Sequence, residues 1–461
     1  MGDVSLMLLV VAGIFIIGSA GEIVFARTHV PDVLWLIVCG WLLGPVSGFL
    51  HEAVLLQIAP YFAAVALIVI LFDGGTSLKL GSVAQAAPRA AVLAVTGFCL
   101  SAAVVAALSM LGRWLGVLPR GWSWLDGVLL GAILGGSSSI IILPAMTTSR
   151  TQRKVADILC LESTFTDALC VVTASALVTL LLRRHGASGW SAVATLGQSF
   201  GVAVVIGVVA GTLWLFVLHL LRDREHAYPI TLASLLLLYV LINSLGASAA
   251  MGVLTFAVIV GNARLFGPKL GLAADIDLGA NVRGFHAQMA FIIKSFFFVL
   301  IGALLGPPWP LVAVGVVLGL ILLPVRVPAV QAATYGNGFD RHERAVMATA
   351  LPRGLAAGVM ATIPAAAGVP HTQGLVTVVF ACIVTTIVVF SIGMPLIARW
   401  VPPAVPGPGS AEPVEEVAAA GASEVAGAFE VAGVSPAGVQ PAGTADATGR
   451  EETPIQGSPP L

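Results

Sequence analysis

Apolar runs of about 20 residues recur along the chain, separated by short breaks that hold charges, proline or glycine. Only 10% of the residues are charged, whereas a soluble domain has about 25%. Inside lipid, every backbone N–H and C=O must be hydrogen-bonded within the protein, so runs of this length fold as helices. The sequence therefore predicts an all-α polytopic membrane protein with about 13 transmembrane helices. The predicted spans are 5–25, 32–49, 58–78, 88–112, 123–147, 154–182, 190–221, 229–246, 249–265, 285–306, 309–328, 342–367 and 372–399.

The basic residues between the spans predict how the chain is oriented. If the N-terminus lies outside, most of them fall on the cytoplasmic side, Arg326 among them, and only Arg113, Arg120, Arg183 and Arg184 fall outside. This asymmetry follows the positive-inside rule. We therefore expect a multi-pass protein of the cell membrane, with the N-terminus outside and the C-terminus in the cytoplasm.

The composition changes after Trp400. Residues 401–461 are rich in Pro, Gly, Ala, Val and Glu and show no amphipathic period, which indicates a disordered cytoplasmic tail. We therefore expect a membrane domain over 1–400 and a tail over 401–461. The five cysteines show no metal-type spacing, and we find no nucleophile motif, so we expect neither an enzyme nor a cofactor. A net charge of -1 argues against nucleic acid as a partner.

Two carboxylates lie within the apolar span 154–182, namely Glu162 and Asp167. Asp167 is placed near the middle of the membrane, where an ionised group costs roughly 3 kcal/mol on insertion scales. Such a residue indicates a transport or proton-relay site. The alternative is a carboxylate that is held neutral or is paired for structure only. On a helix, Ser163 is a neighbour of Asp167, and Thr166 is a neighbour of Glu162.

Two spans carry clear helix interruptions. The span 123–147 contains two glycines and three serines at 135–139, and the span 342–367 contains Leu351-Pro352-Arg353-Gly354. They are the fifth and the twelfth spans, which correspond in an inverted repeat of six spans, a connector and six more. Transporters commonly place their substrate site between two such broken helices, so we predict two crossed discontinuous helices. The alternative for 123–147 is a kinked helix whose small residues permit close packing.

The membrane-embedded cations should each pair with an acid, because an unpaired buried charge is costly. We predict that Arg353 pairs with Glu162, since its fork can hold a carboxylate and also bond the Thr166 hydroxyl. Asp167 is then left without a fixed partner, which is what an exchangeable site needs. Lys294 either competes for Asp167 or braces the crossing helices.

These residues together resemble the monovalent cation:proton antiporter superfamily, particularly the bacterial and archaeal sodium/proton exchangers with 13 spans. The matching pieces are Glu162-Ser-Thr-Phe-Thr-Asp167, the Gly-Gly-Ser-Ser-Ser break, Lys294-Ser-Phe-Phe-Phe-Val-Leu-Ile-Gly302, Pro352-Arg353-Gly354 and Ile259-Val-Gly-Asn262. The likeness covers about residues 5–399.

The resemblance implies a homodimer whose protomers each have a six-helix core and a separate dimerisation layer. It implies that Asp167 carries the ion and that Ser163 completes the site with backbone oxygens of the 135–139 break. The residues predicted to bind the ion or the proton are Asp167, Ser163, Thr166, Ser137 and Ser138. Glu162 and Arg353 form the supporting pair, and Lys294 matches a position where relatives carry Lys or Arg. Relatives usually have Asn or Asp where this chain has Thr166.

Our hypothesis is exchange of Na⁺ or Li⁺ for H⁺ by alternating access, with both ions competing for Asp167. Because Thr166 does not titrate, a single carboxylate exchanges one proton for one cation, which favours electroneutral transport. Proton release by Lys294 is the alternative that would make exchange electrogenic. K⁺/H⁺ exchange at the same residues and a cation channel are the other functions considered. A channel would need rings of carbonyls or charges, which the sequence does not show.

Overall fold

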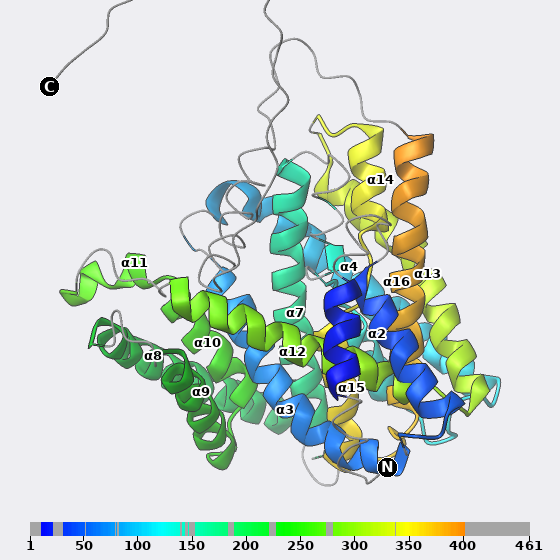
Figure 1. Cartoon of the computed structure of the whole chain (residues 1–461), viewed down its shortest axis with the longest axis horizontal. Helices are drawn as coiled ribbons and strands as arrows, with labels where there is room; N and C mark the ends of the chain where they lie inside the picture. Colours follow the sequence, from blue (N-terminus) through cyan, green and yellow to red (C-terminus); the bar gives the residue numbers. More distant parts are fainter. Residues whose placement is uncertain are drawn as a thin grey trace, which may run out of the picture. The chain divides into compact units, whose positions relative to one another are not determined.

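The computed structural model describes residues 11–21, 31–50, 52–78, 80, 83–138, 141, 142, 146, 153–182, 189–220, 227–272, 280–336 and 338–401. All of them belong to one compact unit. Within these ranges the chain is helical and contains no strand (Figure 1). The predicted cytoplasmic tail lies outside the described residues apart from Val401, and Ser139 also lies outside them.

The main helices are α2 (Asp32–Trp41), α3 (Glu52–Ser77), α4 (Val83–Trp114), α5 (Trp124–Ile133), α7 (Arg153–Leu182), α8 (Gly189–Leu220), α9 (Ala227–Ser244), α10 (Ala249–Gly261), α12 (Ala280–Ala303), α13 (Trp309–Ala333), α14 (Arg341–Thr349), α15 (Leu355–Ala366) and α16 (Leu375–Trp400). A further apolar helix covers Val11–Gly21, and the short segments are a π-helical turn at Leu42–Val46, α11 (Ala263–Phe266) and a 3₁₀ turn at Pro268–Leu270.

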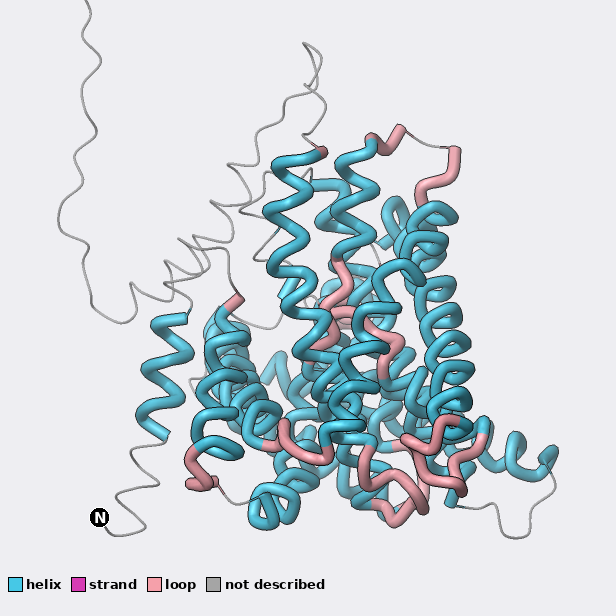
Figure 2. Tube along the Cα trace, turned by 90° about the vertical axis from the view of Figure 1, so that its right-hand side faces the viewer, coloured by secondary structure: helices cyan, strands magenta, loops and turns pink. Residues whose placement is uncertain are grey.

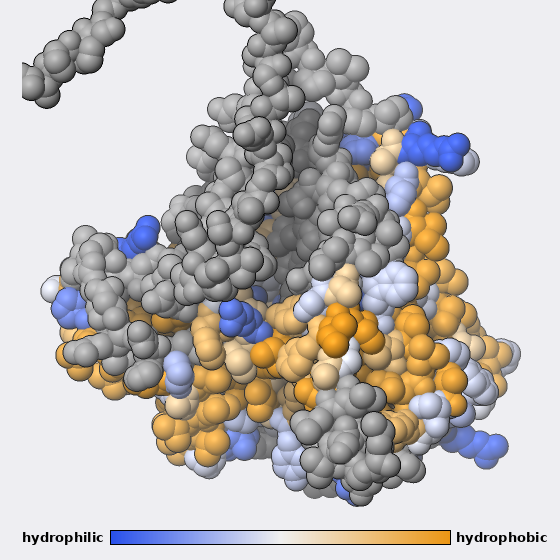
Figure 3. All heavy atoms as spheres, in the orientation of Figure 1, coloured by the Kyte–Doolittle hydropathy of each residue, from blue (hydrophilic) through white to orange (hydrophobic). Residues whose placement is uncertain are grey.

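Seven of these helices are long and apolar enough to cross a membrane, and six further apolar helices of 10–17 residues lie among the described residues. Each span predicted from the sequence contains a helix of one of these two groups. The number of membrane crossings stays a prediction. Apolar side chains cover much of the outer surface (Figure 3). On α8, for example, Val205, Val209 and Leu213 are exposed, which suits contact with lipid.

The helices pack in two groups. In one, α4 contacts α5, α7 and α13, and α13 contacts α16; in the other, α10 contacts α3 and α8, and α12 contacts α2. Glycines permit close approach at several of these contacts. A Cβ at Gly40 would collide with the Val299 carbonyl, and one at Gly302 would collide with the Ile37 carbonyl. The backbones of α2 and α12 therefore touch directly, as small residues allow in membrane helices.

The two predicted breaks are present, and they cross. Helix α5 ends at Ile133 and is followed by non-helical residues 134–138, while 350–354 separate α14 from α15. The backbone N–H of Ser138 donates to the carbonyl of Pro352 across the crossing, at 2.9 Å. Loop segments therefore lie inside the helical bundle as well as at its ends (Figure 2). The prediction of two crossed discontinuous helices is confirmed.

The first half-helix of each broken pair, α5 in one and α14 in the other, begins with the same capping arrangement. Ser123 and Asp126 form a capping box at the start of α5, and Asp340 and Glu343 form one at the start of α14. In each box the backbone N–H groups that would lack an intrahelical partner are bonded by side chains. Each half-helix therefore has a defined starting residue, which fixes where its other end lies in the bundle.

Gly354 tests the crossing directly. A Cβ at this position would collide with the side chain of Ser138 on the other broken helix. Gly354→Ala should therefore lower the free energy of unfolding by about 1–3 kcal/mol through overpacking, and the melting temperature of the purified protein should fall. Gly284→Ala, at a helical position with open space, is the control and should not lower it. Equal melting temperatures for the two variants would contradict the crossing.

Candidate ion-binding site

Asp167 lies in the middle of α7, against the break that follows α5. Its side chain is partly buried, and a Cβ added at Gly136 would lie 3.6 Å from Asp167 Oδ1. The carboxylate therefore lies close to the backbone of Gly136. Among the residues that the structure describes, none donates a hydrogen bond to Asp167 or forms an ion pair with it. Within the described part of the chain, Asp167 therefore has no fixed partner.

Two hydrogen bonds hold the break against α7 beside Asp167, and a third, within α7, orients the Thr166 hydroxyl. The Ser137 N–H donates to Thr166 Oγ1 at 3.1 Å, and this hydroxyl donates to the Ser163 carbonyl at 3.1 Å. Ser163 Oγ donates to the Ser137 carbonyl at 2.9 Å. Both backbone groups of Ser137 are therefore bonded by α7 side chains. Thr166 and Ser163, predicted as ion ligands, also act as anchors of the unwound backbone.

The pairing that was predicted for Glu162 is wrong. Glu162 is 1% exposed and is held by Arg326, with Nη1–Oε1 at 3.1 Å and Nη2–Oε2 at 2.9 Å. Ser137 Oγ donates to the same carboxylate at 2.9 Å. The sequence analysis missed Arg326 because it lies two residues before the predicted end of its span at 328 and was counted among the cytoplasmic basic residues. Helix α13 continues to Ala333, so Arg326 lies inside a helix and is buried. The apolar residues 329–333 were the signal that could have shown this.

Arg353 has a different role from the one predicted. Its Nη1 donates to the carbonyls of Gly135 and Gly136, and its Nη2 donates to Ser101 Oγ at 3.3 Å. These carbonyls follow the last turn of α5, where a helix leaves acceptors without partners and carries partial negative charge. Arg353 therefore neutralises the interrupted end of α5 and does not pair with Glu162.

Arg326 serves the other broken helix in the same way. Besides holding Glu162, its Nε donates to the carbonyl of Met347 at 2.8 Å, in the last turn of α14. Cys170 on α7 adds a further contact, with its Sγ donating to the Ile133 carbonyl at 3.3 Å. Each half-helix that ends at the crossing therefore has a buried arginine at its carbonyl end. This is how a break is tolerated at membrane depth.

Lys294 joins two helices, but they are not the crossing helices that it was predicted to brace. Its Nζ lies 2.7 Å from Asp32 Oδ2, and both side chains are largely buried. The pair joins α12 to the start of α2, close to the glycine contacts between these helices. Asp32 was not recognised as a partner, because an acid at the first residue of an apolar run is typical of a helix start.

Two polar residues at predicted span ends connect neighbouring helices. The Asn262 side chain donates to the Leu78 carbonyl at 2.6 Å and accepts from the Leu80 N–H at 2.7 Å, so it caps the end of α3. Asp73 on α3 lies 3.5 Å from Nε2 of His286 on α12, with His286 buried and Asp73 half exposed. Asn262 therefore caps a helix end, and Asp73 links α3 to α12.

A polytopic helical protein in which two broken helices cross beside an uncommitted carboxylate has the architecture of a secondary transporter. The chain belongs to the sodium/hydrogen exchanger family, whose transmembrane family model matches residues 10–400. It is therefore a multi-pass cation/proton antiporter of the NhaP type. Members of this family transport ions and are not enzymes.

Curated relatives support this assignment. The chain is 25% identical over 450 residues to the K⁺/H⁺ antiporter NhaP of Alkalimonas amylolytica, covering 95% of this chain and 74% of that protein. It is 24% identical to the K⁺/H⁺ antiporter NhaP2 of Shewanella sp. strain ANA-3, covering 82% of this chain but only 63% of that protein. The Na⁺/H⁺ antiporter 1 of Methanocaldococcus jannaschii is 23% identical, with coverage of 62% and 66%.

A solved structure shows the same fold. The sodium proton antiporter MjNhaP1 of Methanocaldococcus jannaschii at pH 8 superposes with a TM-score of 0.68 at 19% identity. The match covers 86% of this chain and 97% of that one. The predicted resemblance to the antiporter superfamily is therefore confirmed, for the fold and for the family.

A double-mutant cycle separates the observed pairing from the predicted one. Glu162→Gln or Arg326→Gln alone leaves a buried charge without its partner and should lower the free energy of unfolding by about 3–5 kcal/mol. The coupling energy between positions 162 and 326 should exceed that between 162 and 353, measured from the melting of the purified variants. Arg344→Gln, an exposed position on α14, is the control. Stronger coupling to 353 would refute the assignment.

Proposed function

We propose that this protein exchanges Na⁺ or Li⁺ for H⁺ by alternating access, with the two ions competing for Asp167. The observation that carries the proposal is the division of roles between the two carboxylates of α7. Glu162 is fixed by a bidentate arginine, whereas no described residue bonds Asp167. Only the second carboxylate can bind and release a small cation without breaking the supporting contacts.

The chemistry follows from the surroundings of Asp167. Moving an ionised carboxylate through a low-dielectric barrier is costly. The part of the protein that carries Asp167 therefore changes access only when a proton or a metal cation neutralises this carboxylate. Na⁺ is a hard cation that prefers oxygen ligands. We assign these to the Asp167 carboxylate, to the hydroxyl of Ser163 and to the oxygens of Ser137 and Ser138. Thr166 holds this group in place through its hydrogen bond to the Ser137 N–H.

The charge count favours electroneutral exchange. Thr166 occupies the place of a second acid and does not titrate, and Glu162 is held by Arg326. Lys294, the alternative proton donor, is paired with Asp32. One carboxylate therefore exchanges one proton for one monovalent cation, and no net charge crosses the membrane in a cycle.

K⁺/H⁺ exchange at the same residues is the alternative function. Two of the relatives described above are named K⁺/H⁺ antiporters, and another is named a Na⁺/H⁺ antiporter. All of these cations would use the same carboxylate, so they differ only in how well the surrounding oxygens fit the ion. Competition between Na⁺, Li⁺ and K⁺ in one transport assay separates the two functions.

We further propose that the protein works in the cell membrane as a homodimer, with the N-terminus outside and the C-terminus in the cytoplasm. The apolar outer surfaces of α8 and α9 support this proposal. Val205 and Leu213 on α8 and Leu237 and Val240 on α9 are among their most exposed residues. These two helices pack mainly against α10, whereas Asp167 lies on α7 beside the broken helices.

Asp167→Asn tests the ion site. The amide keeps the shape of the side chain but can neither take up a proton nor balance a cation, so cation-dependent proton flux in proteoliposomes should vanish. The melting temperature should stay within a few degrees of the wild type, since no described contact is lost. Asp157→Asn, an exposed acid on the same helix, should retain most of the flux. Flux through the Asp167→Asn protein would refute the assignment.

Electrical measurements test the stoichiometry. On a solid-supported membrane, a jump in Na⁺ concentration should cause proton movement without a sustained current, because each cycle moves one positive charge in each direction. Proton flux in proteoliposomes should likewise not change when the membrane potential is clamped at different values. A current whose sign follows the proton gradient would show that a second proton is carried.

A further inference from the structure

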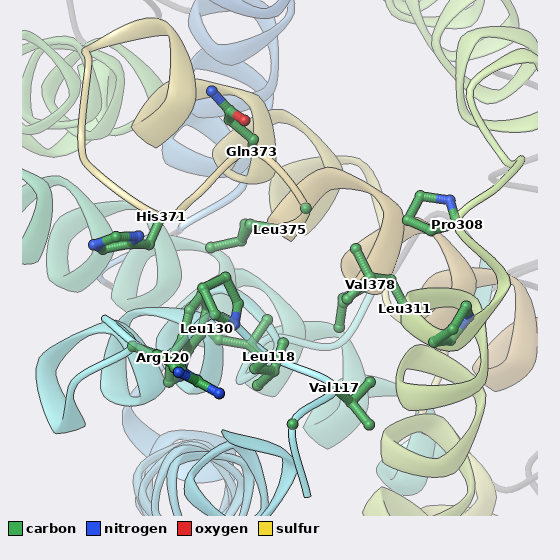
Figure 4. Close-up of a pocket in the computed structure, with 15 residues that line it drawn as sticks. Val117, Leu118, Arg120, Leu130, Pro308, Leu311, His371, Gln373, Leu375 and Val378 are labelled. Atoms are coloured by element: carbon green, nitrogen blue, oxygen red, sulfur yellow. The ribbon is translucent and has the colours of Figure 1, made fainter. Parts of the chain in front are cut away.

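A cavity lies away from Asp167, where α4 ends and α5, α13 and α16 begin. Its volume is about 880 Å³, and it is lined by residues 116–120, Trp122, Leu130, and residues from 308–311 and 371–378 (Figure 4). None of the residues assigned to ion binding lines it. The positive-inside pattern of the sequence places these loops on the outer side of the membrane.

Exposed tryptophans mark the depth of this cavity. Trp114 at the end of α4 is 81% exposed, and Trp124 and Trp309 at the starts of α5 and α13 are each 61% exposed. Tryptophan concentrates where a bilayer meets water, because its ring is apolar while its N–H can be hydrated. The cavity therefore lies at the level of the lipid headgroups.

The lining is polar on one side and apolar on the other. Figure 4 shows Arg120 and His371 on one side of the pocket, and Leu311 and Val378 toward the opposite side. The Arg120 side chain is exposed, and no described residue accepts a hydrogen bond from it or pairs with it. Its guanidinium fork is suited to a phosphate.

The polar rim is held in an unusual conformation. Among the described residues, His371 is the only non-glycine residue with a positive φ, at 66°. Its ring lies against Gly121, next to Arg120, so closely that a Cβ at Gly121 would collide with it. Strained backbone of this kind persists where the surroundings impose it, and it is concentrated at binding sites.

We propose that this cavity binds one anionic phospholipid of the outer leaflet. Its phosphate contacts Arg120 beside His371, and one acyl chain lies over Val117, Leu311 and Val378. A soluble anion would leave the apolar side of the cavity uncovered, and an apolar ligand would leave Arg120 without an acceptor. A phospholipid at headgroup depth satisfies both sides.

The test uses purified, delipidated full-length protein in a neutral detergent. Titration with phosphatidylglycerol should raise the melting temperature in a saturable way, and native mass spectrometry should retain one lipid per chain. Phosphatidylcholine should act more weakly, and glycerol phosphate, which is the headgroup alone, should not act. If phosphatidylcholine raised the melting temperature as much as phosphatidylglycerol, the negative charge of the lipid would not be recognised, and the proposal would be overturned. An equal effect of glycerol phosphate would identify a soluble anion instead of a lipid.

Variants locate the effect. Arg120→Gln should raise the half-saturating phosphatidylglycerol concentration about tenfold, since it removes a charge-assisted contact to phosphate. Leu311→Gln should weaken binding from the apolar side, and Arg120→Lys, which keeps the charge, should be intermediate. Arg344→Gln on α14 is the matched control and should titrate like the wild type. Indistinguishable titrations for Arg120→Gln and Arg344→Gln would overturn the proposal, whatever the exchange assays show.

Discussion

The bidentate pair between Glu162 and Arg326 is the interaction on which the rest of the structure depends. Both side chains are almost fully buried, and the guanidinium of Arg326 donates two hydrogen bonds to the carboxylate of Glu162. Through Ser137 and Met347, the same pair reaches the break after α5 and the end of α14. One ion pair therefore fixes α7, α13 and both broken helices relative to one another. Removing either partner would leave an uncompensated charge in a dry interior.

The second requirement is that interrupted helices leave no backbone group unsatisfied inside the membrane. The end of α5 meets it with Arg353 on the carbonyls of Gly135 and Gly136, and with Cys170 on that of Ile133. The Ser137 carbonyl is bonded by Ser163. Among the described residues, Glu162, Arg326 and Arg353 all bond groups of the scaffold, so Asp167 is the charged group that we assign to an exchangeable ion. In our account, stability and transport are thus divided between two acids five residues apart.

The sequence was sufficient to predict the helical fold and both breaks. Each of these follows from a local pattern: apolar length, and the Gly-Gly-Ser-Ser-Ser and Leu-Pro-Arg-Gly interruptions. It was not sufficient to predict which cation pairs with which acid. That choice depends on where a helix ends and on how helices far apart in the sequence pack. Because Arg326 lies near the predicted end of its span, it was counted as a cytoplasmic residue, and Glu162 was then assigned to Arg353. Lys294 and Asp32 are likewise 262 residues apart and meet only through packing.

Counting the protons released when a cation binds tests the central claim most directly. Na⁺, Li⁺ or K⁺ is added to purified protein in weakly buffered detergent solution, and the protons released are measured alongside the cation bound. If Asp167 is the only exchangeable carboxylate, one proton is released for each cation bound, and Asp167→Asn releases none. Release of two protons per cation, or release that persists in Asp167→Asn, would contradict this account.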